Sequence, residues 1–121
     1  MRVQVYWNLH KKSWSVVALE GERKGRVIRY GSKQIFVKDA TFVVQPAGRD
    51  RVRREGRKNV HAFVRGEWVA HLAGVRNENT VAVKYNPYKF DTFVTSETEE
   101  PIFAAKSVAL FGPHDVVAEI K

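Results

Sequence analysis

The chain contains no cysteine, and this absence excludes disulfide bonds, thiol catalysis and zinc sites with cysteine ligands. It also has no run of about 18 apolar residues, the length that a membrane-spanning helix needs. The first residues, "MRVQVYWNLHKK", alternate polar and apolar side chains and lack the apolar core of a signal peptide. We therefore expect a cytoplasmic protein with no membrane partner.

The motifs of several common enzyme classes are also missing. The sequence has no G-x-x-x-x-G-K-S/T phosphate loop, no G-x-G-x-x-G, no G-x-S-x-G and no H-E-x-x-H. His61 and His71 could share a metal on paired strands, but no third ligand is apparent, so we interpret both as ordinary sheet residues. We expect no enzymatic activity, no catalytic residue, no metal and no cofactor.

Length and charge set the broad class of the protein. The chain has 121 residues, of which 44% are hydrophobic and 12% aromatic. This is enough to bury a core, and it predicts a single domain over residues 1–121. The formal net charge of +8 raises the local concentration of anions around the protein. Charge alone does not choose among nucleic acid, nucleotides and acidic proteins.

Alternation of apolar and polar residues predicts a β-rich fold. Before the middle of the chain, short strands are predicted at residues 2–9, 13–19, 26–30, 34–38 and 40–45. Farther along, the predicted elements are a hairpin at 59–72 that turns at "RGE", a strand–turn–strand at 81–94, and strands at 102–111 and 115–120. This spacing is typical of an antiparallel sheet or small open barrel, so we expect a mostly β, α+β domain. We expect strand 102–111 to be exposed at an edge, where a second copy could pair with it.

A basic segment interrupts the strands. Pro46 can open a helix, because its missing N–H would be unpaired in the first turn, and helix formers follow it. We expect one exposed helix at about residues 46–58 that rests on the domain through Val52. The cations of this segment are Arg49, Arg51, Arg53, Arg54, Arg57 and Lys58.

The excess of cations in this segment favours an anion site. Helical spacing places Arg49, Arg53 and Arg57 in one row and the other cations in a second row. Only two carboxylates are available nearby, and arginine forks match phosphate geometry. The alternative is a solubilising surface helix without a ligand.

The stretch "YNPYKF" is the second candidate element. Its aromatic rings alternate with lysines, a combination that suits base stacking with phosphate neutralisation. Alternatively, its tyrosines pack the corner of a barrel and hydrogen-bond the turn. Just after the basic segment, Asn59 and His61 could read polar edges of a ligand. The predicted ligand-binding residues are Arg49, Arg53, Arg54, Arg57, Lys58, Asn59, His61, Tyr85 and Tyr88.

Three stretches of the chain carry a family resemblance. "VYWNLHKKSWSV", "GRDRVRREGRKNVHAFVRGEWV" and "VKYNPYKFDTFV" resemble a group of short, uncharacterised proteins encoded by tailed phages and prophages. The match covers most of the chain. The resemblance implies a phage accessory protein that acts in the cytoplasm of a host bacterium, and it implies no catalytic residue.

Three hypotheses for function remain open. The first is a non-enzymatic protein that binds a phosphate-bearing ligand, either nucleic acid or a nucleotide signal that the phage sequesters to counter a host defence. The second is an interaction module whose basic helix inhibits an acidic host protein. The third is a structural or assembly component that forms a homo-oligomer.

Overall fold

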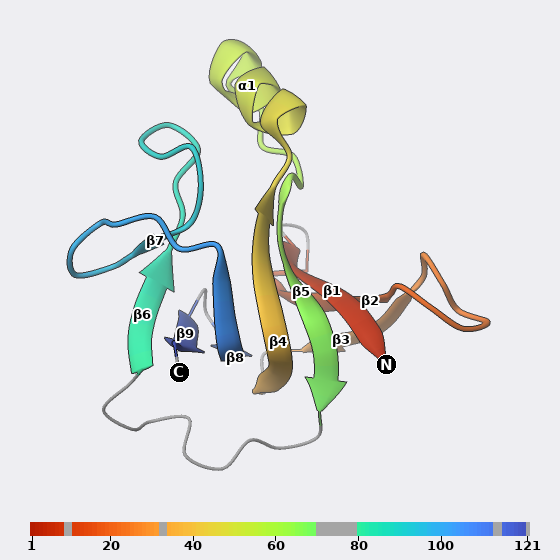
Figure 1. Ribbon diagram of the computed structural model, residues 1–121. Helices are drawn as coiled ribbons and strands as arrows, with labels where there is room; N and C mark the ends of the chain where they lie inside the picture. Colours follow the sequence, from red (N-terminus) through yellow and green to blue (C-terminus); the bar gives the residue numbers. More distant parts are fainter. Residues whose placement is uncertain (9–10, 32–33, 70–79, 113–114, 121) are drawn as a thin grey trace.

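The computed structural model describes residues 1–8, 11–31, 34–69, 80–112 and 115–120. In this part of the chain, nine antiparallel strands form an open sheet with the order β3-β2-β1-β5-β4-β8-β9-β6-β7, and one helix lies at one end of it (Figure 1). The elements are β1 (Arg2–Asn8), β2 (Ser13–Ala18), β3 (Val27–Gly31), β4 (Ile35–Val44), α1 (Pro46–Glu55), β5 (Ala62–Val69), β6 (Thr80–Lys84), β7 (Val94–Thr95), β8 (Ala104–Phe111) and β9 (Asp115–Glu119). The predicted fold class is confirmed.

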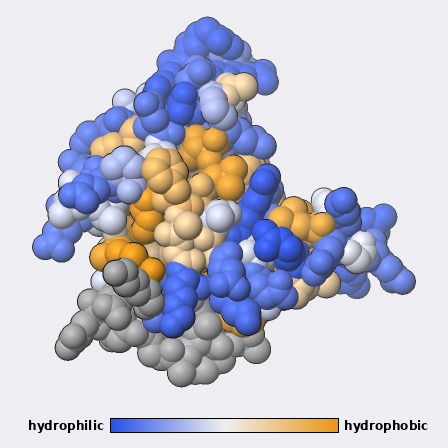
Figure 2. All heavy atoms as spheres, in the orientation of Figure 1, coloured by the Kyte–Doolittle hydropathy of each residue, from blue (hydrophilic) through white to orange (hydrophobic). Residues whose placement is uncertain are grey.

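The sheet is strongly curved, and its inner face holds the core. Val3 and Val5 from β1 belong to the same buried cluster as Val108 and Leu110 from β8, and each is at most 1% exposed. Alternate residues of a strand point to opposite faces, so the period-two pattern of β1 places its apolar side chains inside. In Figure 2 the helix forms a hydrophilic cap above the more apolar surface of the sheet.

Two strands predicted at residues 34–38 and 40–45 are one continuous strand, β4. Asp39 lies between them with a φ of 50°, and the pairing with β5 shifts register between Lys38 and Thr41. A bulge of this kind absorbs an extra residue without ending the strand. The sequence signal for a break was therefore a local irregularity inside β4.

The hairpin predicted at residues 59–72 is also wrong, because the "RGE" stretch lies inside β5. A Cβ atom on Gly66 would approach the Lys38 carbonyl oxygen to 2.7 Å and would also strike the Val37 side chain. The glycine thus allows β5 to pass close to the bulge of β4, which is a known reason for glycine within a strand. Residues 70–72 lie outside the described part of the chain.

The strand predicted at residues 102–111 is not an edge. β8 lies between β4 and β9 and pairs with both, and Ser107, Val108, Ala109 and Leu110 are all buried. Nearly continuous burial is typical of an interior strand. A second copy therefore cannot pair with β8 in the way that was expected, because a strand already lies on each side of it.

Helix α1 begins where it was predicted and ends earlier. Pro46 occupies its first turn, and Val52 is its buried residue. The helix stops at Glu55 rather than at residue 58, because Gly56 adopts the left-handed conformation with φ 68° and its N–H caps the Val52 carbonyl. Within the described residues, no helix is long and apolar enough to cross a membrane.

Candidate functional site

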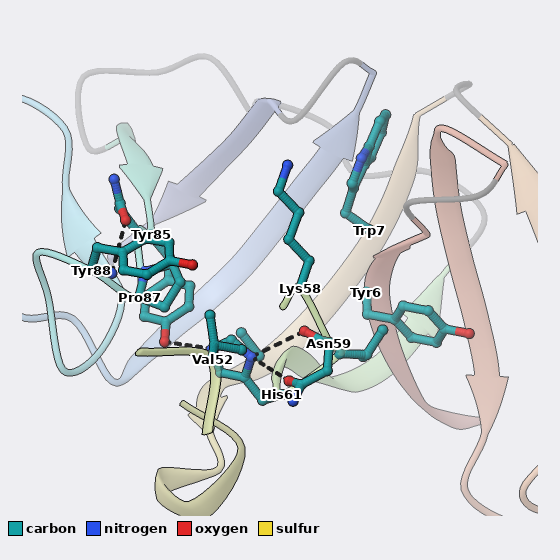
Figure 3. A pocket seen from close by; sticks show the side chains of 12 residues that line it. Tyr6, Trp7, Val52, Lys58, Asn59, His61, Tyr85, Pro87 and Tyr88 are labelled. Atoms are coloured by element: carbon teal, nitrogen blue, oxygen red, sulfur yellow. Dashed lines mark hydrogen bonds between the residues drawn. The ribbon is translucent and has the colours of Figure 1, made fainter. Parts of the chain in front are cut away.

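Several strand ends meet beside the C-terminal end of α1. The end of β1 lies next to the start of β5, because the two strands run antiparallel, and β6 leads into the loop that follows Lys84. Together with the residues after α1, these ends enclose a pocket of about 450 Å³ (Figure 3). Pockets for small ligands have volumes of roughly 300–1,000 Å³, so the space suits a ligand of nucleotide size.

The pocket brings together five of the nine predicted ligand-binding residues. They come from two separate parts of the sequence, and they are Lys58, Asn59, His61, Tyr85 and Tyr88. The four predicted arginines do not line the pocket. The basic segment and the "YNPYKF" stretch were predicted as separate candidate elements, and the fold makes them opposite sides of one site.

One face of α1 packs on the floor of the pocket. Gly48 and Val52 are one turn apart and therefore share this face. Val52 is 2% exposed, and a Cβ atom added at Gly48 would lie 2.6 Å from His61 Cβ. The backbone of the helix thus rests directly against His61, and a side chain at position 48 would push the two apart.

The neighbouring row of α1 ties the helix to residues 85–93, the segment between β6 and β7 that we call the tyrosine loop. Arg53 donates hydrogen bonds to the carbonyl oxygens of Pro87 and Phe90 and to the carboxylate of Asp91, the last two at 3.0 Å. Arg49 donates to the Asp91 carbonyl oxygen, also at 3.0 Å. These two guanidinium groups are engaged by the protein itself. Their evident effect is to hold the loop that carries Tyr88.

The remaining cations divide into two groups. Arg51 pairs with Glu55 at 2.6 Å along the helix. In the part of the chain that the structure describes, Arg54, Arg57 and Lys58 are exposed and have no hydrogen-bond or ion-pair partner. Arg57 follows the turn at Gly56, so it does not continue the helical row that was predicted for it. Lys58 alone among the three lines the pocket.

A partly buried hydrogen-bond chain forms the base of the pocket. His61 is 5% exposed, and its Nδ1 lies 3.1 Å from both the backbone oxygen and the Oδ1 of Asn59. Because a backbone carbonyl only accepts, Nδ1 carries the hydrogen. Nε2 is then an acceptor, and the Tyr85 hydroxyl donates to it at 2.8 Å (Figure 3).

The environment holds both side chains in their uncharged forms. Burial lowers the pKa of His61, and the nearby Arg49 charge acts in the same direction, although the hydrogen bond to Asn59 opposes them. Burial also raises the pKa of Tyr85 to about 12. Near neutral pH the pair is therefore a neutral imidazole and a protonated phenol.

The two tyrosines of the loop have different roles. Tyr85 is half-buried and packs on Phe93, with 5.2 Å between ring centroids, so it matches the packing alternative and also lines the pocket. Tyr88 is 57% exposed, and its backbone N–H donates to Asn86 Oδ1 at 2.9 Å. In Figure 3 the Tyr88 hydroxyl points toward the side of the pocket where Lys58 lies.

Strand β1 supplies pocket residues that the predicted site did not include. Tyr6 and Trp7 lie on the side of the pocket away from Tyr88 (Figure 3), and Trp7 packs edge-to-face on Trp14 with centroids 5.2 Å apart. The mixture of aromatic and basic residues in "YWNLHKKSW" was the available signal. It could not be used without knowing that β1 pairs with β5. Asn86 and Pro87 were also missed, although they belong to the "YNPYKF" turn.

No metal site emerges from the described residues, in which no three His, Asp or Glu side chains are grouped to hold an ion. His71, the suggested metal partner of His61, lies outside the described residues. The His61 side chain is instead occupied by Asn59 and Tyr85.

Comparison with known proteins identifies the family. The family described as "Mycobacterium phage L5 gene 82 protein" matches residues 1–118. The gene 82 protein of Mycobacterium phage L5 is 47% identical over 116 residues, which cover 91% of this chain and 90% of that protein. No solved structure gives a significant match. The predicted resemblance to a family of short phage proteins is confirmed, and the chain belongs to the family of the Mycobacterium phage L5 gene 82 protein.

Proposed function

We propose that this phage protein is a non-enzymatic accessory protein that binds a phosphate-bearing ligand, a nucleotide or a segment of nucleic acid, in the cytoplasm of the host bacterium. One observation carries the proposal. Lys58, a cation with no partner in the described residues, lines the same pocket as Trp7, Tyr85 and Tyr88. Aromatic faces beside a cation bind a base by stacking, at about 1–3 kcal/mol per base, and neutralise its phosphate.

The distribution of charge around the pocket suggests how a ligand would lie. Lys58 is inside the pocket lining, whereas Arg54 and Arg57 are exposed outside it. A single nucleotide would place its phosphate at Lys58, and a longer strand would extend along the two arginines. Arg49 and Arg53 take part indirectly, because their hydrogen bonds hold the tyrosine loop in place. Such binding without turnover would withdraw a nucleotide signal from a host defence system.

Titration of AMP and of a short single-stranded oligonucleotide at two salt concentrations tests the proposal. Trp7 is in the pocket wall, so tryptophan fluorescence together with calorimetry can follow binding. We expect the affinity to fall as salt rises, because binding of phosphate by a cation releases counterions. Equal affinity at both salt concentrations would argue against a phosphate-dominated site.

A matched pair of lysine variants separates the pocket from the overall charge. Lys58→Gln is expected to weaken binding of AMP about tenfold, equivalent to about 1.4 kcal/mol. Lys24→Gln makes the same chemical change in the turn between β2 and β3, remote from the pocket, and is expected to leave the affinity unchanged. Equal losses in the two variants would mean that net charge, and not the pocket, attracts the anion.

A second candidate function is favoured by the two arginines outside the pocket. Arg54 and Arg57 have no partner in the described part of the chain, and they offer a basic surface to an acidic host protein. Pull-down from bacterial lysate with and without nuclease distinguishes the two functions. A partner that survives nuclease and is lost from the Arg54→Gln, Arg57→Gln double variant supports protein binding. Loss of every partner on nuclease treatment contradicts it.

A further inference from the structure

On the basis of the proposed function, we infer that the Tyr85 hydroxyl makes the pocket selective for bases with an exocyclic amino group. Adenine and cytosine carry such a group, whereas hypoxanthine and uracil carry a carbonyl oxygen at the same position of the ring. The selectivity depends on the direction of one hydrogen-bond chain, which runs from Tyr85 through His61 to Asn59.

The chain starts at the backbone of Asn59 and ends at the pocket. The Asn59 carbonyl oxygen can only accept, so the hydrogen of the neutral His61 ring is on Nδ1. The other ring nitrogen, Nε2, must then accept the hydrogen of the Tyr85 hydroxyl, which lies 2.8 Å away. A phenol has a single hydrogen and two lone pairs. With its hydrogen committed to His61, Tyr85 can meet a ligand only as an acceptor.

The surroundings hold this direction in place. His61 is buried, and if Tyr85 turned its hydrogen toward a ligand, the buried Nε2 would be left without a partner. In the described part of the chain, Tyr85 donates to His61 and no residue donates to the Tyr85 hydroxyl. The oxygen of Tyr85 therefore keeps its lone pairs for a donor in the pocket, such as an amino group.

Two asparagines supply the complementary donors. Asn86 Oδ1 accepts the Tyr88 N–H, and Asn59 Oδ1 accepts from His61. Their amide NH₂ groups therefore point away from these contacts, and neither has a partner among the described residues. Both asparagines line the pocket together with Tyr85, so the amino donor and the adjacent ring nitrogen acceptor of adenine or cytosine can each be offered a partner of the right kind. Hypoxanthine and uracil present the opposite order.

Two pairs of nucleotides test the inference, because each pair differs in this one group. AMP is compared with IMP and CMP with UMP, by calorimetry on the whole protein. We expect the amino-bearing member of each pair to bind about tenfold more tightly, the effect of roughly one hydrogen bond gained and one mismatch avoided. Tyr85→Phe is expected to reduce both ratios toward one. Lys24→Gln, which changes a residue outside the pocket lining, is expected to preserve them.

A second measurement does not depend on any variant folding correctly. The ¹⁵N chemical shifts of the His61 ring report which nitrogen carries the hydrogen. Hydrogen on Nδ1 supports the inference, and hydrogen on Nε2 overturns it, because Tyr85 would then be the acceptor from His61 and a donor toward the pocket.

The outcomes separate this inference from the proposed function. Binding of IMP or UMP as tightly as AMP or CMP overturns the selectivity while leaving nucleotide binding intact. If none of the four nucleotides and no oligonucleotide binds at low salt, the proposed function itself fails, and the inference fails with it.

Discussion

Replacing Gly48 in α1 by alanine is expected to destabilise the protein, which is the opposite of the usual effect in a helix. Alanine in a helix interior is normally favoured over glycine by about 0.5–1 kcal/mol. At this position the added Cβ would lie 2.6 Å from His61 Cβ and 3.5 Å from His61 Cγ. The two Cβ atoms would need to separate by about 1 Å to reach ordinary contact.

The free energy of the change follows from these opposing terms. Overpacking of this kind costs about 1–3 kcal/mol, and the neighbour is the Cβ of a buried side chain that is already hydrogen-bonded on both ring nitrogens. After subtraction of the propensity gain, we expect the free energy of unfolding to fall by about 1 kcal/mol, and by about 2.5 kcal/mol at most.

Urea unfolding followed by tryptophan fluorescence measures this difference as a lower midpoint at constant slope. Ala47→Gly is the control, because residue 47 is exposed on the same helix and should show the propensity effect alone, a loss of about 0.5–1 kcal/mol. A Gly48→Ala protein as stable as the wild type, or more stable, would refute the close packing of α1 on His61.

Three further predictions concern the same region and the bulge of β4. Burial lowers the pKa of His61 in the folded protein, so the unfolded state binds more protons as the pH falls. The contribution of His61 to the free energy of unfolding should therefore be constant above about pH 6.5 and decrease below that value. Over the same pH range, the urea midpoint of His61→Gln should decrease less than that of the wild type. Arg53→Gln removes the ties to the tyrosine loop and should speed backbone hydrogen exchange at residues 86–91, whereas Arg51→Gln should not. Gly66→Ala should lower the free energy of unfolding, measured in urea, by about 1–3 kcal/mol, because the Lys38 carbonyl lies in the way; an unchanged unfolding midpoint would contradict that contact.

Local sequence signals were enough for the fold class and for the helix start. Period-two alternation identified β1 and β2, because most apolar residues of each strand lie on one buried face, although Ser15 on the other face of β2 is buried as well. Pro46 identified the start of α1, and Val52, the one large apolar residue in this helix, identified the face on which it rests. Each of these features depends on residues close together in the chain.

Glycine and bulge signals were misread, because their meaning depends on the neighbouring strand. "RGE" is compatible with a tight turn, and only the approach of Val37 and Lys38 shows why a glycine is needed within β5. Asp39 likewise reads as a break in the sequence, although pairing of β4 with β5 and β8 on either side continues the strand through it.

The site was predictable in composition but not in arrangement. Lys58, His61 and Tyr85 were all candidates, yet no sequence pattern indicates that Lys58 and Tyr85 line the same pocket. That requires the sheet order, which sets the start of β5 near the end of β6 only after the sheet curves. The inward turn of Arg49 and Arg53 could not be foreseen either, because the carbonyl groups that hold them belong to a loop far along the chain.

The central claim is that a phosphate-bearing ligand occupies the pocket between the end of α1 and the tyrosine loop. A ¹H–¹⁵N NMR titration of the intact protein with AMP tests it most directly. The account predicts that the largest shifts are at the backbone amides of Lys58, Asn59, Asn86 and Tyr88 and at the Trp7 indole. Shifts confined to the exposed face of α1 around Arg51, or spread evenly over the basic surface, would contradict it.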